Sequence, residues 1–169
     1  MFKDRKQLLF KIIFLVSILA LVSAFFIEYI LRHQPCNLCI FERIPYLLAI
    51  IIILFNYKFD QFEKFFILLL AIVFLAGTIL SLYHLGIEQG FIQESLVCDL
   101  KSGSNLLSKE EILKQLQEKN VSCKDVTFKI FGLSLTSYNI LISLVISVSA
   151  VKIYFNYDKN KKKKSRRIY

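Results

Sequence analysis

Two cysteines three residues apart, Cys36 and Cys39, stand in the segment Pro35-Cys36-Asn37-Leu38-Cys39 and are the residues best suited to chemistry. Thiols at this spacing can close a small disulfide ring or exchange with the thiol of a partner protein. A disulfide across so short a loop contributes little stability, which disfavours a purely structural purpose. The same spacing occurs in zinc sites, so a metal centre is the competing interpretation.

Two ionisable residues, Arg43 and His84, are candidates to support the cysteine pair. If a helix begins after Cys39, Arg43 shares one face with Cys39, and a guanidinium there favours thiolate over thiol. The alternative is an arginine that only anchors a membrane span. His84 ends an apolar run, where an ionisable residue is a functional candidate; the alternative is an interfacial histidine bonded to a neighbour. Glu28 and Glu88 are expected at the wetted ends of helices.

The elements that must position these residues are apolar. Hydrophobic residues make up 56% of the 169-residue chain, against about 45–50% in soluble domains, and the mean hydropathy is +0.55. A membrane span needs about 20 apolar residues. The apolar runs predict an all-α membrane protein with one domain over residues 1–169, a four-transmembrane-helix bundle. The expected spans are residues 8–31, 44–57, 65–86 and 130–154.

The second apolar run is shorter than a span requires. It is still counted as a span, because the loops otherwise fall on inconsistent sides of the membrane. Either a helix starts at Ile40, or the chain from Ile40 onward sinks into the headgroup layer. The second arrangement places Cys39 and Arg43 at the membrane surface.

Basic residues predict the orientation. Four come before the apolar stretch that begins at Ile12 (Lys3, Arg5, Lys6 and Lys11), and seven lie in the tail over residues 158–169. Basic segments stay on the cytoplasmic side, so both termini are expected there, with two extracytoplasmic loops over residues 32–43 and 87–129. A bacterial inner membrane with periplasmic loops fits this pattern. Topology and anionic lipid headgroups explain the basic tail, and no nucleic-acid partner is expected.

All four cysteines then fall in the outer loops, Cys98 and Cys123 in the second. An even number in a compartment where disulfides persist favours disulfide chemistry. Zinc is disfavoured because the second pair lacks the Cys-x-x-Cys spacing and an oxidising exterior works against four free thiolates. Two pairs in separate loops suit an electron relay, and two structural disulfides without redox activity are the alternative.

A capping box at 108–111 predicts a helix over 109–119, lying on the bilayer or on the ends of the spans.

The motif Pro35-Cys36-Asn37-Leu38-Cys39-Ile40-Phe41-Glu42-Arg43, followed by His84, Cys98 and Cys123, resembles the disulfide bond formation protein B (DsbB) family. The resemblance covers most of the chain, although this sequence has no tryptophan, which many members carry near the last span. It implies a membrane protein-disulfide oxidoreductase. The enzyme would oxidise a soluble thioredoxin-like, DsbA-type partner and pass the electrons to a quinone, ubiquinone or menaquinone.

The same resemblance implies a role for each site residue. Cys98 would be attacked by the partner's thiolate, with Cys123 as its disulfide mate. Cys36 would exchange with the second loop, while Cys39 would face the quinone. The quinone-binding residues would be Arg43, which polarises a quinone oxygen, and His84. Two rivals stay open: a scaffold with two structural disulfides, and an electron-importing thiol reductase.

Overall fold

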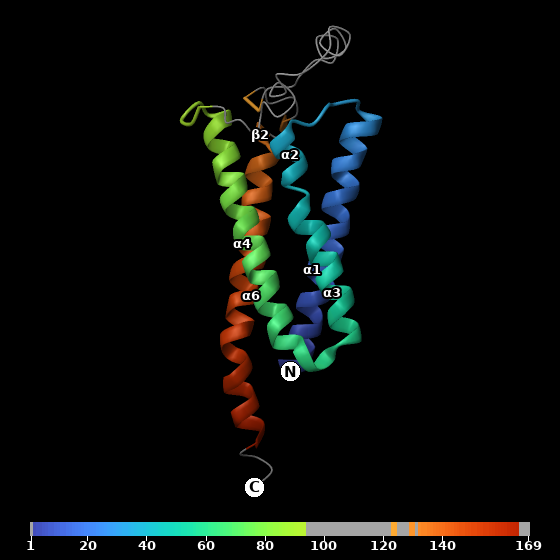
Figure 1. Ribbon diagram of the computed structural model, residues 1–169, viewed down its shortest axis with the longest axis vertical. Helices are drawn as coiled ribbons and strands as arrows, with labels where there is room; N and C mark the ends of the chain where they lie inside the picture. Colours follow the sequence, from blue (N-terminus) through green and yellow to red (C-terminus); the bar gives the residue numbers. More distant parts are fainter. Residues whose placement is uncertain (1, 94–122, 125–128, 131, 166–169) are drawn as a thin grey trace, which may run out of the picture.

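The computed structural model describes residues 2–93, 123–124, 129–130 and 132–165. Within these residues, four helical segments are long and apolar enough to cross a membrane, at Lys6–Ile30, Asn37–Lys58, Glu63–Glu88 and Leu135–Tyr157. They form a bundle (Figure 1), which confirms the predicted four-helix membrane fold. The expected helix over residues 109–119 lies outside the described residues.

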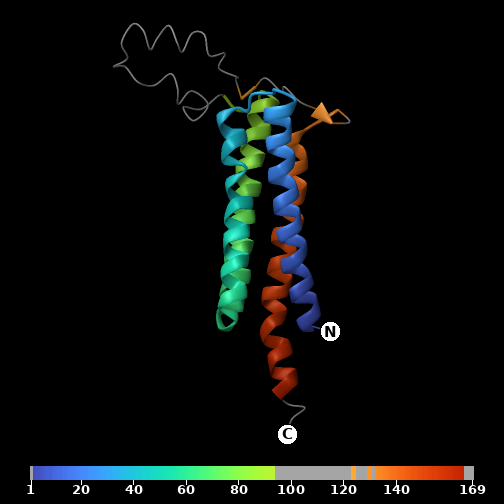
Figure 2. The same cartoon turned by 90° about the vertical axis from the view of Figure 1, so that its right-hand side faces the viewer.

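The elements follow one another in a simple up-and-down order. Both termini lie at one end of the bundle, and the connection between η1 and α2 lies at the other end (Figures 1 and 2). The elements are α1 (Phe2–Phe25), the π-helix η1 (Phe26–Ile30), α2 (Asn37–Phe41), α3 (Ile44–Lys58), the 3₁₀ helix η2 (Asp60–Phe62), α4 (Glu63–Glu88), β1 (Lys129–Ile130), β2 (Leu133–Ser134) and α6 (Leu135–Ser165). The two strands are antiparallel, with Ile130 opposite Leu133, and they precede the last span.

The second span owes its length to α2. Only two residues, Glu42 and Arg43, separate α2 from α3, and Pro45 lies in the first turn of α3, where a helix tolerates proline. Together they make the 22-residue span Asn37–Lys58, roughly 33 Å long at ~1.5 Å per residue. That length crosses a hydrocarbon core of about 30 Å. The Cys-x-x-Cys segment therefore opens a membrane span.

Small residues bring the helices close together. Ala49, Ala71 and Ala150 are at most 4% exposed, and the Ser147 hydroxyl donates to the backbone carbonyl of Ala71 on the neighbouring α4 at 3.1 Å. Close backbone approach and hydrogen bonds between helices hold membrane bundles together, because lipid supplies no hydrophobic driving force between them. The helices α4 and α6 are therefore closely packed, and this packing fixes the positions of the residues at their ends.

Large apolar side chains cover the outer faces of the helices. Leu15, Ile51, Leu75 and Val145, one from each of the four spans, are 48–64% exposed. Water would not support so much exposed hydrocarbon on every side of a small bundle. A bilayer satisfies it, which is why the polar residues of the spans are found inside.

At the end of the bundle that carries the termini, one carboxylate joins three helices. Glu63, at the start of α4, is paired with Lys6 of α1 and accepts a hydrogen bond from the Tyr157 hydroxyl of α6 at 3.5 Å. The Lys6 ammonium also lies 4.8 Å from the centre of the Tyr157 ring. This cluster fixes α1, α4 and α6 relative to one another at the end of the bundle that carries the termini.

We predict that Gly77 cannot be enlarged without moving α3. A Cβ atom at Gly77 would lie 3.0 Å from Pro45 Cγ, part of a rigid ring. Gly77→Val should lower the free energy of unfolding by about 1–3 kcal/mol, the usual cost of overpacking. The measurement is unfolding in mixed detergent micelles, followed by helical circular dichroism.

Gly86→Val is the matched control, because it introduces the same side chain at a second glycine of α4. The nearest atom there belongs to the flexible side chain of Ile92, which can rotate away. Equal destabilisation by the two substitutions would show that α3 does not press on α4 at Gly77.

Candidate functional site

The Cys36–Cys39 pair forms a disulfide at the start of α2, with 5.2 Å between the Cα atoms. Cys36 is extended (φ −69°, ψ 165°) and caps the helix, its sulfur accepting the backbone N–H of Cys39 at 3.2 Å. Cys36 is 5% exposed, whereas Cys39 is half-buried. The two sulfurs therefore have different surroundings, although they belong to one five-residue segment.

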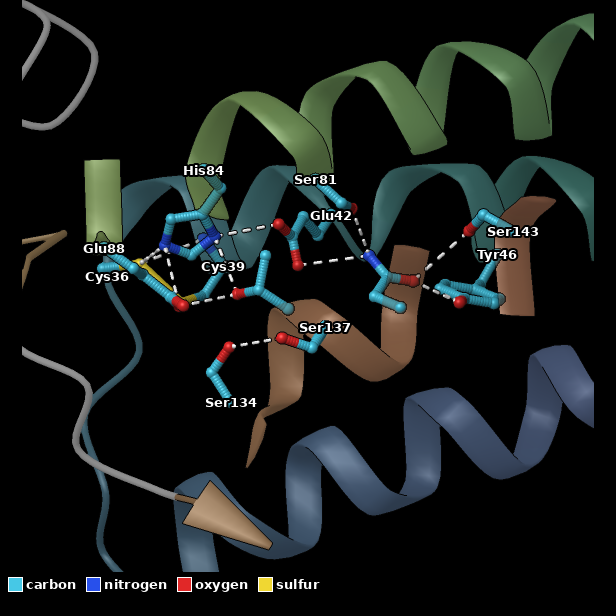
Figure 3. A network of polar contacts seen from close by, with 12 residues as sticks. Cys36, Cys39, Glu42, Tyr46, Ser81, His84, Glu88, Ser134, Ser137 and Ser143 are labelled. Atoms are coloured by element: carbon cyan, nitrogen blue, oxygen red, sulfur yellow. Dashed lines mark hydrogen bonds and ion pairs between the residues drawn. A yellow bond between two sulfur atoms is a disulfide. The ribbon is translucent and has the colours of Figure 1, made fainter. Parts of the chain in front are cut away.

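His84 of α4 lies directly against this disulfide. Its Nε2 is 3.5 Å from Cys36 Sγ, and its Nδ1 is 2.8 Å from Glu42 Oε1. A carboxylate only accepts hydrogen bonds, so Nδ1 carries the proton and donates it to Glu42. In the neutral ring, Nε2 then presents its lone pair to Cys36 (Figure 3).

A polar network behind Glu42 fixes this carboxylate. Asn139 of α6 donates to Glu42 Oε2 at 3.1 Å and to the Ser81 hydroxyl of α4 at 2.8 Å. The amide oxygen of Asn139 accepts from the Tyr46 hydroxyl of α3 and from Ser143. Buried polar groups need such partners, since an unpaired one costs free energy. Three helices thus meet in one hydrogen-bonded chain that ends at His84 (Figure 3).

Glu88 lies one helical turn beyond His84 and is buried. Its side chain is 6% exposed, and Oε1 lies 3.8 Å from His84 Nε2. Oε1 also accepts from the Thr136 hydroxyl at 2.8 Å, while Oε2 is buried with no hydrogen-bond partner among the described residues. The expectation of a wetted helix end is therefore wrong for Glu88, because α6 packs over the last turn of α4.

Arg43 is paired with Glu28 of the π-helical turn, and the N–O distance is 2.5 Å. Its guanidinium also lies 5.2 Å from the centre of the Phe25 ring. Glu28 is thus not merely a wetted helix end, because its carboxylate balances the Arg43 charge and ties α1 to the second span. Sequence reasoning had related Arg43 to Cys39, to a quinone oxygen or to the anchoring of a span, and had not paired it with Glu28.

A cavity of about 640 Å³ joins these groups. It is lined from α1, from the loop before α2, and from α2, α3, α4 and α6. Five sequence-predicted site residues border it: Cys36, Cys39, Arg43, His84 and Cys123. The sixth, Cys98, lies outside the described residues. Most of the remaining lining is apolar, so the cavity has a wide hydrocarbon wall and one chemically active end.

Cys123 joins the two outer loops at this end. It is 3% exposed and disulfide-bonded, and it belongs to one buried cluster with Cys36, Leu38 and Ile87. A cysteine from the second loop therefore lies in the same apolar cluster as the disulfide of the first loop. The family resemblance implied that Cys36 exchanges with the second loop, but no spacing in the sequence placed Cys123 beside Cys36.

Sequence reasoning missed Glu42, Glu88, Thr136 and Asn139 as parts of the site. For Glu88, the signal was its place at the end of a membrane span, since an ionisable residue there is a functional candidate by default. Thr136 and Asn139 gave no such signal, because uncharged polar residues are common in spans. Glu42 was hidden inside the motif by the more conspicuous Arg43.

Together these features define a multi-pass membrane protein with a thiol–disulfide centre at one end of a helical bundle. The comparisons agree. The family described as "Disulfide bond formation protein DsbB" matches residues 6–153. The chain is also 35% identical, over 164 residues and 94% of each chain, to the "Uncharacterized protein RP370" of Rickettsia prowazekii (strain Madrid E). The chain belongs to the DsbB family, and membership indicates a membrane disulfide oxidoreductase.

We predict that Asn139→Leu destabilises the bundle. The substitution leaves Glu42, Tyr46 and Ser81 without a shared partner, and each unsatisfied buried group costs about 1–3 kcal/mol. The free energy of unfolding in mixed micelles should therefore fall by at least ~1 kcal/mol.

Ser137→Ala provides the comparison on the same helix. The Ser137 hydroxyl lies 3.2 Å from the Ser134 hydroxyl and takes no part in the network around Asn139, so the loss of this hydroxyl should be nearly neutral. If Asn139→Leu is as stable as Ser137→Ala, the network does not stabilise the fold.

Proposed function

We propose that the chain is a membrane thiol oxidase. It takes electrons from a soluble thioredoxin-like, DsbA-type partner and passes them through Cys98/Cys123 and Cys36/Cys39 to a membrane quinone. The observation that carries this proposal is the shared cavity, which is bordered by the Cys36–Cys39 disulfide, by Cys123 and by Arg43. Such a cavity lets one disulfide face a second cysteine pair and an apolar acceptor.

In the first exchange, a thiolate of the reduced partner attacks Cys98. A bond forms between the partner sulfur and Cys98, the Cys98–Cys123 bond breaks, and Cys123 leaves as the thiolate. A second partner thiolate then attacks the mixed disulfide. The partner departs oxidised, and Cys98 is left as a thiolate.

The electrons next move between the loops. The Cys123 thiolate attacks Cys36, and Cys39 leaves; Cys98 then attacks Cys123 and releases Cys36. Both second-loop cysteines are again oxidised, and the pair Cys36/Cys39 holds the two electrons. The packing of Cys123 with Cys36 in one buried cluster supports this order.

His84 and Glu42 suit the handling of protons in this exchange. Each thiol that reacts must first lose its proton, and each thiolate released can take one up. His84 Nε2 lies 3.5 Å from Cys36 Sγ with its lone pair available. Glu42 stabilises the ring after it accepts a proton. His84 is thus placed to exchange a proton with a thiol at Cys36.

The cavity fits a quinone in size and character. Its volume of about 640 Å³ lies within the range of about 300–1,000 Å³ typical of ligand pockets. The wall contributed by α1 is apolar, and the opposite end holds the Arg43 guanidinium, a donor suited to a carbonyl oxygen. A bound quinone supplies a two-electron, two-proton acceptor. Arg43 and His84 would hold its ring near Cys39.

The same proposal assigns the surroundings of the chain. We place both termini in the cytoplasm and the loops over residues 32–43 and 87–129 in the periplasm of a bacterial inner membrane. The basic residues of the N-terminus and of the tail over residues 158–169 support this orientation. A DsbA-type partner has a reduction potential of about −120 mV, so its re-oxidation needs an electron acceptor as strong as a quinone.

The purified chain should reduce a soluble quinone when it is supplied with a reduced thioredoxin-like partner. The measurement is the loss of quinone absorbance, with thiol titration of the partner. Cys123→Ser should trap a covalent complex with the partner, and Cys98→Ser should form none. A scaffold with structural disulfides predicts no turnover, and an electron importer predicts that the partner becomes reduced rather than oxidised. Either result would overturn the proposed function.

Arg43→Gln should weaken the use of quinone by roughly ten- to a hundredfold. A hydrogen bond from a charged donor contributes about 1.5–3 kcal/mol, and each 1.36 kcal/mol is about tenfold in rate. Arg43→Lys should restore only part of this, because it keeps the charge and loses the planar fork. The measurement is steady-state kinetics with quinone varied at saturating reduced partner.

The control is exchange between the partner and the second cysteine pair, which should be nearly intact in Arg43→Gln. If Arg43 only anchors the second span, Arg43→Lys will behave as the parent. Arg43→Gln will then lower the amount of folded protein and leave the quinone dependence of the rate unchanged.

A further inference from the structure

Three potential metal ligands converge at the end of the cavity that holds the disulfide, and a fourth lies beside one of them. Ligand atoms of Cys36, Cys39 and His84 all lie within 4.8 Å of one another. Glu88 adds a carboxylate oxygen 3.8 Å from His84 Nε2. All four side chains border the same cavity, and they come from two elements that packing holds together (Figure 3).

The spacing of these atoms matches a tetrahedral zinc site. Zinc lies ~2.3 Å from thiolate sulfur and ~2.0 Å from imidazole nitrogen, so neighbouring ligand atoms are roughly 3.3–3.8 Å apart. Cys36 Sγ is 3.5 Å from His84 Nε2. The distance from His84 Nε2 to Glu88 Oε1 is 3.8 Å. Once the disulfide is reduced, the two sulfurs must move apart and the Glu88 carboxylate must turn toward them, because the ligand atoms that already lie within 4.8 Å of one another are those of Cys36, Cys39 and His84.

The outer partner of His84 is also the one that zinc sites use. A histidine ligand usually donates its other ring N–H to a carboxylate, which fixes the ring and raises the basicity of the ligating nitrogen. Glu42 accepts this bond from Nδ1 at 2.8 Å, which leaves Nε2 for a metal. Asn139 in turn holds Glu42 at 3.1 Å.

Glu88 supplies an independent indication of a missing cation. Its side chain is 6% exposed, and Oε2 is buried with no hydrogen-bond partner among the described residues. A buried carboxylate oxygen without a donor is costly, and each such group in a folded protein calls for an explanation. A divalent cation that this carboxylate binds through Oε2 would satisfy it, while Oε1 keeps its hydrogen bond from Thr136.

We infer that the reduced form of this centre binds one zinc ion through Cys36, Cys39, His84 and Glu88. A dithiol or phosphine reductant supplies two electrons to the Cys36–Cys39 bond and is itself oxidised. The two resulting thiols release their protons as the metal binds, and zinc keeps its charge state. The disulfide cannot supply thiolate ligands, so binding depends on reduction. The site differs from the four-cysteine zinc site that the sequence disfavoured.

The test uses the full chain in detergent micelles, freed of quinone, with Cys98→Ser and Cys123→Ser so that one cysteine pair is left. One sample is reduced with a phosphine, and the other is left oxidised. Zinc affinity is measured by competition with a chromophoric chelator. Cobalt(II) reports the ligand set through its thiolate charge-transfer and tetrahedral d–d absorption bands. One ion per reduced chain is expected, with at least ~100-fold weaker binding to the oxidised chain.

Ligand variants in the same background identify the site. Cys36→Ser leaves one thiolate, so the cobalt charge-transfer spectrum of a two-thiolate site should be lost. His84→Gln and Glu88→Gln should each weaken zinc binding at least tenfold. Glu28→Gln is the matched control, because this carboxylate borders the same cavity but faces Arg43; zinc affinity should be unchanged. Helical circular dichroism checks that each variant is folded.

Two results would overturn the inference. One is equal zinc binding by the oxidised and reduced forms of the same polypeptide, a comparison that needs no ligand variant to fold. The other is unaltered affinity and cobalt spectra in folded His84→Gln and Glu88→Gln. The test involves neither quinone nor partner, so it succeeds or fails independently of the proposed oxidase activity.

Discussion

The burial of the Glu42–His84 pair is the constraint on which the rest of this site depends. A carboxylate and an imidazole that lie inside a membrane bundle lose their hydration, and each needs hydrogen bonds in exchange. Asn139, from the last span, provides one of these bonds to Glu42. Removing one partner leaves the other group unsatisfied in the bundle, at a cost of about 1–3 kcal/mol. The requirement therefore couples three helices at the level of the Cys-x-x-Cys segment.

This coupling explains how a flexible-looking loop motif is held against a span. The disulfide ring begins at Cys36, the last residue before α2, yet Leu38 is 1% exposed and His84 contacts the Cys36 sulfur. The ring thus rests on α4, while the Arg43–Glu28 pair ties the following turn to α1. Between these two attachments lies the cavity, bounded by polar groups at one end and by hydrocarbon along α1.

The helices and the redox residues were predictable because their signals are local. Apolar runs predict spans wherever they occur, and Cys36, Cys39 and Arg43 form one short motif. The first turns of the second span were not predictable, because Asn37, Glu42 and Arg43 lower the hydropathy of a helix that buries its polar face. Ile40 and Phe41, on the other side, are 49% and 41% exposed, as lipid-facing residues are.

The environment of the site was beyond sequence reasoning because its contacts are long-range. Glu42 bonds to His84 across 42 positions, and Asn139 bonds to Glu42 across 97. No periodicity or spacing encodes which span a side chain will meet. Glu88 shows the same effect in reverse, since its position at a helix end indicated solvent, whereas packing by α6 removed it from water.

The helix cap at Cys36 makes the two sulfurs of the disulfide unequal when a thiolate opens it. Cys36 Sγ accepts the Cys39 backbone N–H, and after reduction the Cys36 thiol can also donate to His84 Nε2, which lies 3.5 Å away. Cys39 Sγ is bonded covalently to Cys36. It has no hydrogen-bond partner in the part of the chain that the structure describes. When the bond opens, Cys36 is therefore anchored in place, whereas Cys39 is free to change rotamer. Cys36 Sγ therefore keeps its position through the redox cycle, whereas Cys39 Sγ changes position.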